Sequence, residues 1–140
     1  MARILAIDYG SKRVGLAVSD PQQIIANGLT TVHSNDVMEY LQNYISEENV
    51  ECIVVGEPKQ MNNKPSGSAK IVNGFVKNLK KKLPGILIEK VDERFTSKLA
   101  SRAMLNGGLK KKDRQNKELV DKISAILILQ SYLDIKNRKS

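Results

Sequence analysis

The alternation of apolar and polar positions in the first quarter of the chain predicts a three-stranded meander. Runs rich in strand-forming residues cover 4–8, 14–19 and 24–32, and short segments of turn-forming residues separate them. Asn27-Gly28 interrupts the third run, which predicts a bulge or bend there. We therefore expect two hairpins that join three antiparallel strands.

The rest of the chain alternates between helical and strand-like patterns. Apolar residues recur at helical spacing over 36–48, 68–83, 96–107 and 118–133, and strand-like runs cover 51–56 and 86–92. A strand that follows a helical crossover usually runs parallel to its neighbour. The pattern predicts the α/β class, with a five-stranded mixed sheet of three antiparallel and two parallel strands flanked by helices.

Length and composition favour a single domain. A chain of 140 residues with 41% hydrophobic residues is large enough for one core, which we place at 1–135, followed by a basic tail at 136–140. No run approaches the roughly 20 apolar residues of a membrane span, and the apolar start is too short for a signal peptide. We expect a cytoplasmic protein without a membrane partner, in which Cys52 is a buried structural thiol.

A net charge of +8 and a pI near 9.6 suggest a polyanionic partner such as nucleic acid, although charge by itself is equally compatible with no specific partner. Basic and polar residues that could contact phosphates fall in three places: the first turn, the start of the helix at 96–107, and the loop after it. They are Lys12 and Arg13; Arg94, Thr96 and Ser97; and Lys110, Lys111, Lys112 and Arg114.

Acidic residues stand at the ends of two predicted buried strands. Asp8 ends the first strand, and Asp92 and Glu93 end the fifth. If these strands are parallel, their carboxylates meet at one edge of the sheet, where the scaffold fixes them and leaves them accessible. Neighbouring strands lie about 4.8 Å apart, which we expect to be close enough for the two strand ends to share a cation. We therefore expect catalytic residues at this edge of the sheet.

Asp121 adds a third acid from the last helix. It precedes the most apolar part of that helix and shares a face with Ser124 and Ala125, whose small side chains would let the helix approach the sheet. Carboxylates that cluster in a low dielectric need a cation, and Mg²⁺ or Mn²⁺ accepts oxygen ligands. Two such ions can hydrolyse a phosphodiester bond. Asp8, Glu93 and Asp121 are therefore the candidate catalytic and metal-binding residues.

Five segments together resemble the YqgF/RuvX family of pre-16S ribosomal RNA nucleases. They are Ile7-Asp8-Tyr9-Gly10, Arg13-Val14-Gly15-Leu16-Ala17, Val54-Val55-Gly56, Asp92-Glu93-Arg94-Phe95-Thr96-Ser97 and Val120-Asp121-Lys122-Ile123-Ser124-Ala125. The resemblance implies a ribonuclease H-like fold related to RuvC-type resolvases. It also implies a metal-dependent nuclease that processes the 5′ end of pre-16S rRNA in ribosome biogenesis, or one that resolves Holliday junctions in DNA.

The same resemblance matches Asp8, Glu93 and Asp121 with the three acids of the family. The sequence departs from the family at Glu57-Pro58, where an apolar residue usually precedes the proline. Glu57 could therefore supply an extra metal ligand or replace Glu93, and Asp92 is a further candidate ligand.

Two other classes of function fit part of the pattern. An actin-like ATPase also begins with a hairpin that carries an Asp-x-Gly motif, but it clamps its nucleotide between two domains, and this chain has the length of one. A non-catalytic RNA-binding assembly factor would keep the fold and the charge, although the three acids argue against it. The choice between structured RNA and branched DNA stays open, as does that between a monomer and a weak homodimer.

Overall fold

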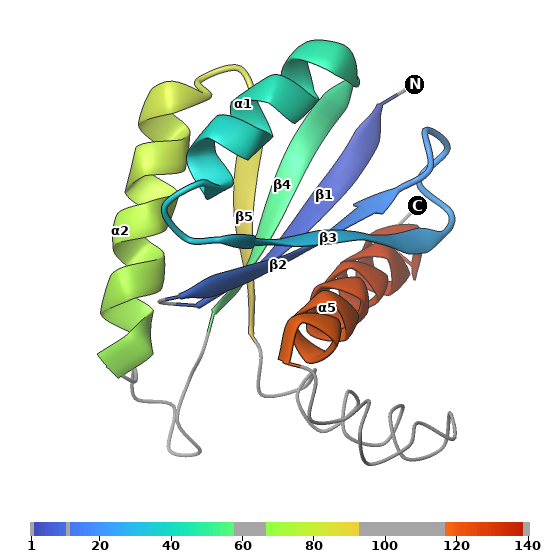
Figure 1. Cartoon of the computed structure of the whole chain (residues 1–140). Coiled ribbons are helices and arrows are strands. Elements are labelled where there is room, and N and C mark those ends of the chain that lie inside the picture. The colour runs from blue at the N-terminus through green and yellow to red at the C-terminus, as the bar shows by residue number, and fades with distance from the viewer. Residues whose placement is uncertain (1, 11, 58–66, 93–116, 139–140) are drawn as a thin grey trace.

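The structure is a computed structural model of the chain and describes residues 2–10, 12–57, 67–92 and 117–138. These residues form a five-stranded sheet and three helices (Figure 1). The strands are β1 (Arg3–Tyr9), β2 (Arg13–Ser19), β3 (Ala26–His33), β4 (Val50–Glu57) and β5 (Leu87–Asp92). The helices are α1 (Val37–Glu47), α2 (Gly67–Lys82) and α5 (Lys117–Arg138).

The strand order confirms the predicted mixed sheet. It runs β3-β2-β1-β4-β5, with antiparallel pairing of β1 with β2 and of β2 with β3. β4 pairs parallel to β1, and β5 pairs parallel to β4. Short turns permit only antiparallel neighbours, whereas α1 and α2 carry the chain back across the sheet and make the next strands parallel. The bulge predicted near Gly28 is confirmed, because Leu16 pairs with Thr30 and Ala17 with Gly28, which leaves Leu29 as an extra residue.

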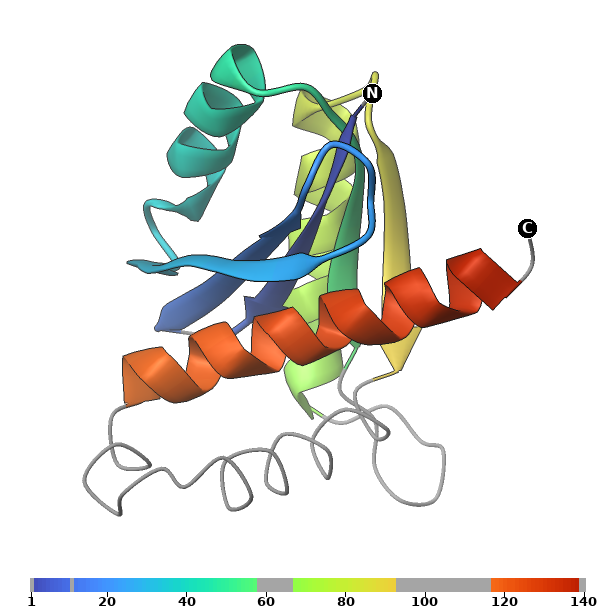
Figure 2. The ribbon, with the colours of Figure 1, turned by 90° about the vertical axis from the view of Figure 1, so that its right-hand side faces the viewer.

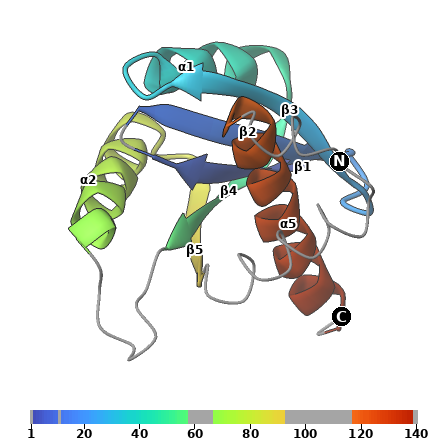
Figure 3. The ribbon, with the colours of Figure 1, turned by 60° about the horizontal axis from the view of Figure 1, so that its bottom comes forward.

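The sheet separates two layers of helices. Figure 2 and Figure 3 show α1 and α2 on one face and α5 across the other. Alternate residues of β1 supply the two faces: Leu5 and Ile7 pack with residues of α1 and α2, and Ile4 and Ala6 pack with residues of α5. A strand covered on both faces must be apolar on both, which is why the run at the start of β1 is continuous.

The boundaries of α2 and α5 differ from the predictions. α2 begins at Gly67, so Ser68 lies inside it, and the helix predicted at 96–107 lies outside the described residues. α5 continues to Arg138, so the segment expected to begin a basic tail at 136 is still helical there. The Lys136 ammonium donates to Gln23 Oε1 at 2.6 Å and lies 3.7 Å from Glu51 Oε1, which ties this end of α5 to the sheet.

Cys52 is buried under α5, which confirms the structural thiol. It is 3% exposed, and its Sγ donates to the Tyr132 hydroxyl at 3.9 Å. Burial raises the pKa of the Cys52 thiol to about 11, and burial also raises the pKa of Tyr132. None of the helices in the described ranges combines the length and apolar character that crossing a membrane requires.

Candidate active site

Asp8 lies near the end of β1, on the face of the sheet that α5 covers. Ile4 and Ala6, at alternate positions before it, pack against α5, so the pleat places Asp8 on the same face. Asp8 is partly exposed, because the strand ends just beyond it at Tyr9. Its partner across the β1–β2 ladder is Gly15. The rim position predicted for this carboxylate agrees with that placement.

Gly15 is where α5 touches the sheet most closely. A Cβ atom at this position would overlap the backbone carbonyl group of Asp121 and lie 3.0 Å from the Lys122 amide nitrogen. Only glycine lets the helix backbone come this near. Because Asp8 and Gly15 are opposed residues, the Asp8 Cα and the Asp121 carbonyl oxygen lie within roughly 9 Å of each other. Two acids far apart in the sequence therefore meet at one place.

A second glycine extends the same contact. A Cβ at Gly28, on β3, would meet Lys122 Cγ and Cδ at 3.1 Å and Ile126 Cδ1 at 3.2 Å. The first turns of α5 thus cross β2 and β3 over two positions without side chains. The crossing fixes the height and the rotation of the helix at the turn that carries Asp121.

Arg13 holds the Asp121 carboxylate. Its guanidinium Nε donates to Asp121 Oδ2 at 3.0 Å, and the two side chains are 38% and 22% exposed. Such a charge-assisted bond is directional, but at this exposure water screens it, so its contribution to stability is of order 1 kcal/mol or less. Its effect is to hold the carboxylate of Asp121 toward Arg13, at the start of β2 and two residues from Gly15.

The turn between β1 and β2 is also constrained. The Gly10 amide donates to the Arg13 carbonyl at 3.0 Å, and a Cβ at Gly10 would lie 2.7 Å from that oxygen. On the opposite face, the Tyr9 ring stacks on Phe75 of α2 with centroids 4.1 Å apart and an interplanar angle of 16°. These contacts fix the backbone on both sides of Asp8 and limit how far Arg13 can move.

The end of β5 lies farther from Asp8 than we expected. The sequence analysis treated the first and fifth strands as neighbours, but β4 lies between them. The two strands are thus about 9.6 Å apart, twice the usual spacing. Backbone pairing of Glu57 with Asp92 confirms that β4 and β5 end at the same edge. Glu57, on β4, is the candidate from the strand next to β1.

The structure describes part of the predicted site. Asp8, Asp121, Lys12 and Arg13 are described with their side chains, and Lys12 is exposed. His33 is exposed and its Nδ1 accepts the Asn35 amide at 3.0 Å, so this side chain has a local structural role. Glu57 and Asp92 are described only in their backbone, and the other predicted residues lie outside the described ranges: Glu93, Arg94, Thr96, Ser97, Lys110, Lys111, Lys112 and Arg114.

Asp8 and Asp121 suit a hard divalent cation, because both offer carboxylate oxygens on one face of the sheet. Among the side chains that the structure describes, which do not include those of Glu57 and Asp92, no group of three or more His, Cys, Asp or Glu is placed to hold a metal ion. A third acid would therefore come from a side chain that the structure does not describe, and Glu93, Glu57 and Asp92 are the predicted candidates.

Sequence reasoning missed the role of Gly15. It attributed the close approach of the last helix to the small residues Ser124 and Ala125. Ala125 is indeed fully buried, but the sheet makes room through its glycines. The available signal was a glycine within an otherwise apolar strand, which often marks the close approach of another backbone.

Comparison with known proteins identifies relatives over the whole described fold. The family RuvX, described as Holliday junction resolvase, matches residues 2–135. A protein of Bacteroides fragilis named "Putative pre-16S rRNA nuclease" is 61% identical over 136 residues, which cover 97% of this chain and 99% of the relative. A protein of the same name from Flavobacterium johnsoniae is 53% identical with the same coverage.

Solved structures agree on the fold. Thermus thermophilus RuvC in complex with a Holliday junction substrate has a TM-score of 0.56 at 17% identity, and the match covers 97% of each chain. A second T. thermophilus RuvC structure has a TM-score of 0.54 at 16% identity and covers 96% of each chain. These likenesses confirm the ribonuclease H-like fold that the sequence resemblance implied. The family match over 2–135 and the relatives at 53% and 61% identity lead to one conclusion: the chain belongs to the RuvX family.

Proposed function

We propose that this protein is a divalent-metal-dependent endonuclease that hydrolyses phosphodiester bonds in the 5′ region of precursor 16S rRNA. The observation that carries the proposal is the close packing of α5 against Gly15, which brings Asp121 near Asp8 on one face of the sheet. Membership of the RuvX family and relatives named as pre-16S rRNA nucleases support it. Such a role would place the protein in the cytoplasm, as a monomer or a weak homodimer.

Asp8 and Asp121, with Glu93 as the proposed third acid, would hold Mg²⁺ or Mn²⁺. The ion would activate a water and stabilise the leaving oxygen of the phosphodiester. Glu57 and Asp92 are further candidate ligands at the same edge. The role of Arg13 is to hold the Asp121 carboxylate in its position. Lys12, exposed in the same turn, is suited to contact a phosphate of the substrate, as are Arg94, Thr96, Ser97 and the basic run at 110–114.

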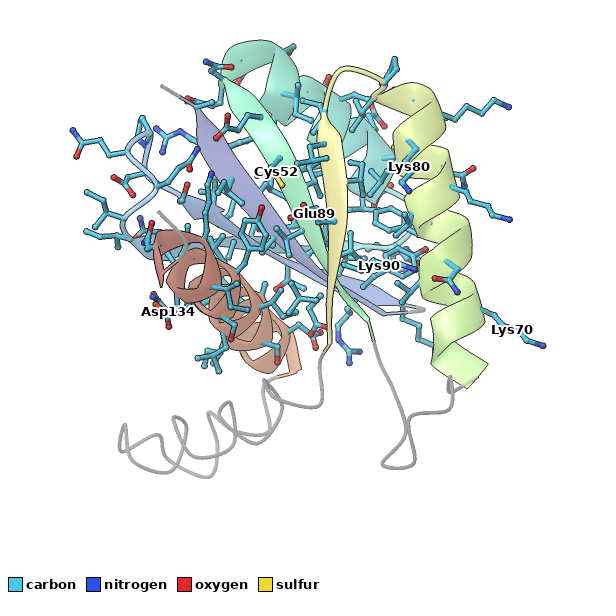
Figure 4. All side chains as sticks on the ribbon, turned by 180° about the vertical axis from the view of Figure 1, so that it is seen from behind. Cys52, Lys70, Lys80, Glu89, Lys90 and Asp134 are labelled. Atoms are coloured by element: carbon cyan, nitrogen blue, oxygen red, sulfur yellow. The ribbon has the colours of Figure 1, made fainter. Side chains whose placement is uncertain are left out.

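The decisive experiment compares Asp8→Asn and Asp121→Asn with Asp134→Asn. Asp134 is an exposed residue of the same helix, α5 (Figure 4). It lies thirteen residues after Asp121, which is more than three helical turns. Purified proteins are given precursor 16S rRNA with Mg²⁺, with Mn²⁺ or with a chelator. We expect metal-dependent cleavage by the wild type and by Asp134→Asn, and loss of at least 10²-fold in the other two variants with unchanged circular dichroism. Full activity of Asp8→Asn would refute the site.

A second candidate function is resolution of four-way DNA junctions. The family description and the RuvC likeness favour it. Running precursor rRNA and four-way junctions side by side on one gel separates the two substrates. Binding without cleavage of either substrate, in either metal, would instead support a non-catalytic assembly factor.

A further inference from the structure

Helix α2 carries positive charge along the whole of its outer side. Five of its exposed side chains are lysines, and the helix contains no acidic residue. The lysines are Lys70, Lys77, Lys80, Lys81 and Lys82. In the part of the chain that the structure describes, none of these lysines forms an ion pair. The positive charge on this helix is therefore not neutralised by the described fold.

Three of these lysines form a straight row, which we call the α2 stripe: Lys70, Lys77 and Lys81. The spacings of seven and four residues bring them to the same side of the helix. The buried residues Val72 and Leu79 belong to the core cluster and fall on the opposite side. At about 1.5 Å of rise per residue, the stripe extends for roughly 16 Å along the helix. Figure 4 shows Lys70 pointing away from the sheet.

The stripe starts at the edge of the sheet that carries the acids. β1 and β4 are parallel, so they end at the same edge, and α2 follows β4 along the chain. Stacking of Tyr9 on Phe75 joins the end of β1, next to Asp8, to the middle of α2. Asp8 and Asp121 lie on the α5 face and the stripe lies on the far side of α2, so a ligand that reaches both must pass around this edge.

We propose that the α2 stripe is a docking surface for the phosphate backbone of a helical RNA segment that flanks the cleavage site. The inference rests on the proposed function for its choice of RNA. A row of ammonium groups that form no ion pair with the described residues suits the phosphates of a duplex, one strand of which carries a charge for about every 3.4 Å of helix axis in DNA. Lysines that contact phosphates bind without reading the sequence. The stripe therefore selects RNA with a helical flank over a short single strand.

The test measures equilibrium binding of precursor rRNA fragments in a chelator, so that it does not depend on cleavage. The triple variant Lys70→Gln, Lys77→Gln, Lys81→Gln loses three charges. We expect the slope of log Kd against log salt to fall in magnitude by about 3, one for each lost contact. The corresponding Lys→Arg variant keeps the charge and should keep the slope.

A charge-matched control separates a docking surface from a general effect of net charge. Gln42→Glu, Asn43→Glu and Ser46→Glu lower the net charge equally at exposed positions of α1. We expect this variant to bind like the wild type. An equal loss in the control, or an unchanged slope in the Lys→Gln triple, would overturn the proposal.

Cleavage kinetics with RNA substrates of different length provide an independent test. With active protein, the Lys→Gln triple should raise KM for RNA that carries a helical flank and leave kcat unchanged, because the stripe does not touch the reacting phosphate. A short strand that spans only the cleavage site should show the same KM with both proteins.

The Lys→Gln triple is also tested for binding to anionic lipid vesicles. If this variant loses vesicle binding but keeps RNA binding, the surface binds membranes and the inference is overturned. If no RNA is cleaved but the salt slope changes as expected, the docking surface stands and the nuclease proposal fails.

Discussion

Gly15→Ala is the sharpest test of how the site is assembled. Gly15 has tighter surroundings than Gly28, because a Cβ at Gly15 overlaps the carbonyl group of Asp121. Real Cβ atoms essentially never come within 3.0 Å of such a neighbour, and the obstructing atoms belong to a helix backbone. To relieve the overlap, α5 must move away from β2 by about 1 Å.

The cost of that movement follows from what lies below the helix. α5 buries Ala125, Ile128, Leu129 and Leu133 against the sheet, and a shift of the first turns strains or opens these contacts. Overpacking of this kind typically costs 1–3 kcal/mol and occasionally more. We expect a loss of about 3 kcal/mol in the free energy of unfolding and a fall in Tm of about 10 °C. Cleavage should fall by about 10²-fold, because Asp121 moves with the helix.

Urea unfolding followed by circular dichroism measures the effect on stability, and Gly74→Ala is the matched control. Gly74 lies within α2, and a Cβ there meets nothing within 4 Å. Alanine is the better helix former, so Gly74→Ala should stabilise the protein by about 0.5–1 kcal/mol. We thus expect the same substitution to lower the free energy of unfolding at Gly15 and to raise it at Gly74. If Gly15→Ala unfolds at the same urea concentration as the wild type, α5 does not rest on β2 as described, and the argument for the site fails.

Three other predictions address single contacts. Arg13→Gln and Asp121→Asn should each cost no more than about 1 kcal/mol, and a double-mutant cycle should give a coupling energy of about 0.5–1 kcal/mol; zero coupling would mean that the pair does not form. Ser19→Ala should cost about 1–3 kcal/mol, because the fully buried Ser19 hydroxyl accepts a strand amide at 2.9 Å, whereas the exposed Ser46→Ala should be nearly neutral; equal effects would contradict the burial argument. Burial raises the pKa of Cys52 from 9.0 to about 11, so the unfolded chain ionises first and stability should fall between pH 9 and 11; urea titrations across that range should show a smaller fall for Cys52→Ala.

The sequence determined the parts of the fold that depend on neighbouring residues. Alternation of apolar and polar residues is a local property, so the hairpins, the parallel strands after helical crossovers and the strand-end position of Asp8 all followed from it. The two-sided burial of β1 was equally visible as a continuous apolar run. Residues beyond the described ranges, including Glu93, remain predictions from the sequence.

Only the tertiary structure decided how remote segments meet. Arg13 and Asp121 are 108 residues apart in the chain, and no periodicity relates them. The sequence could not show that β4 separates β1 from β5, nor that Lys136 holds the end of α5 against Gln23. Periodicity identifies the face that an element buries but not the surface that covers it. That choice depends on shape, and here the missing side chain of Gly15 determines where the last helix lies.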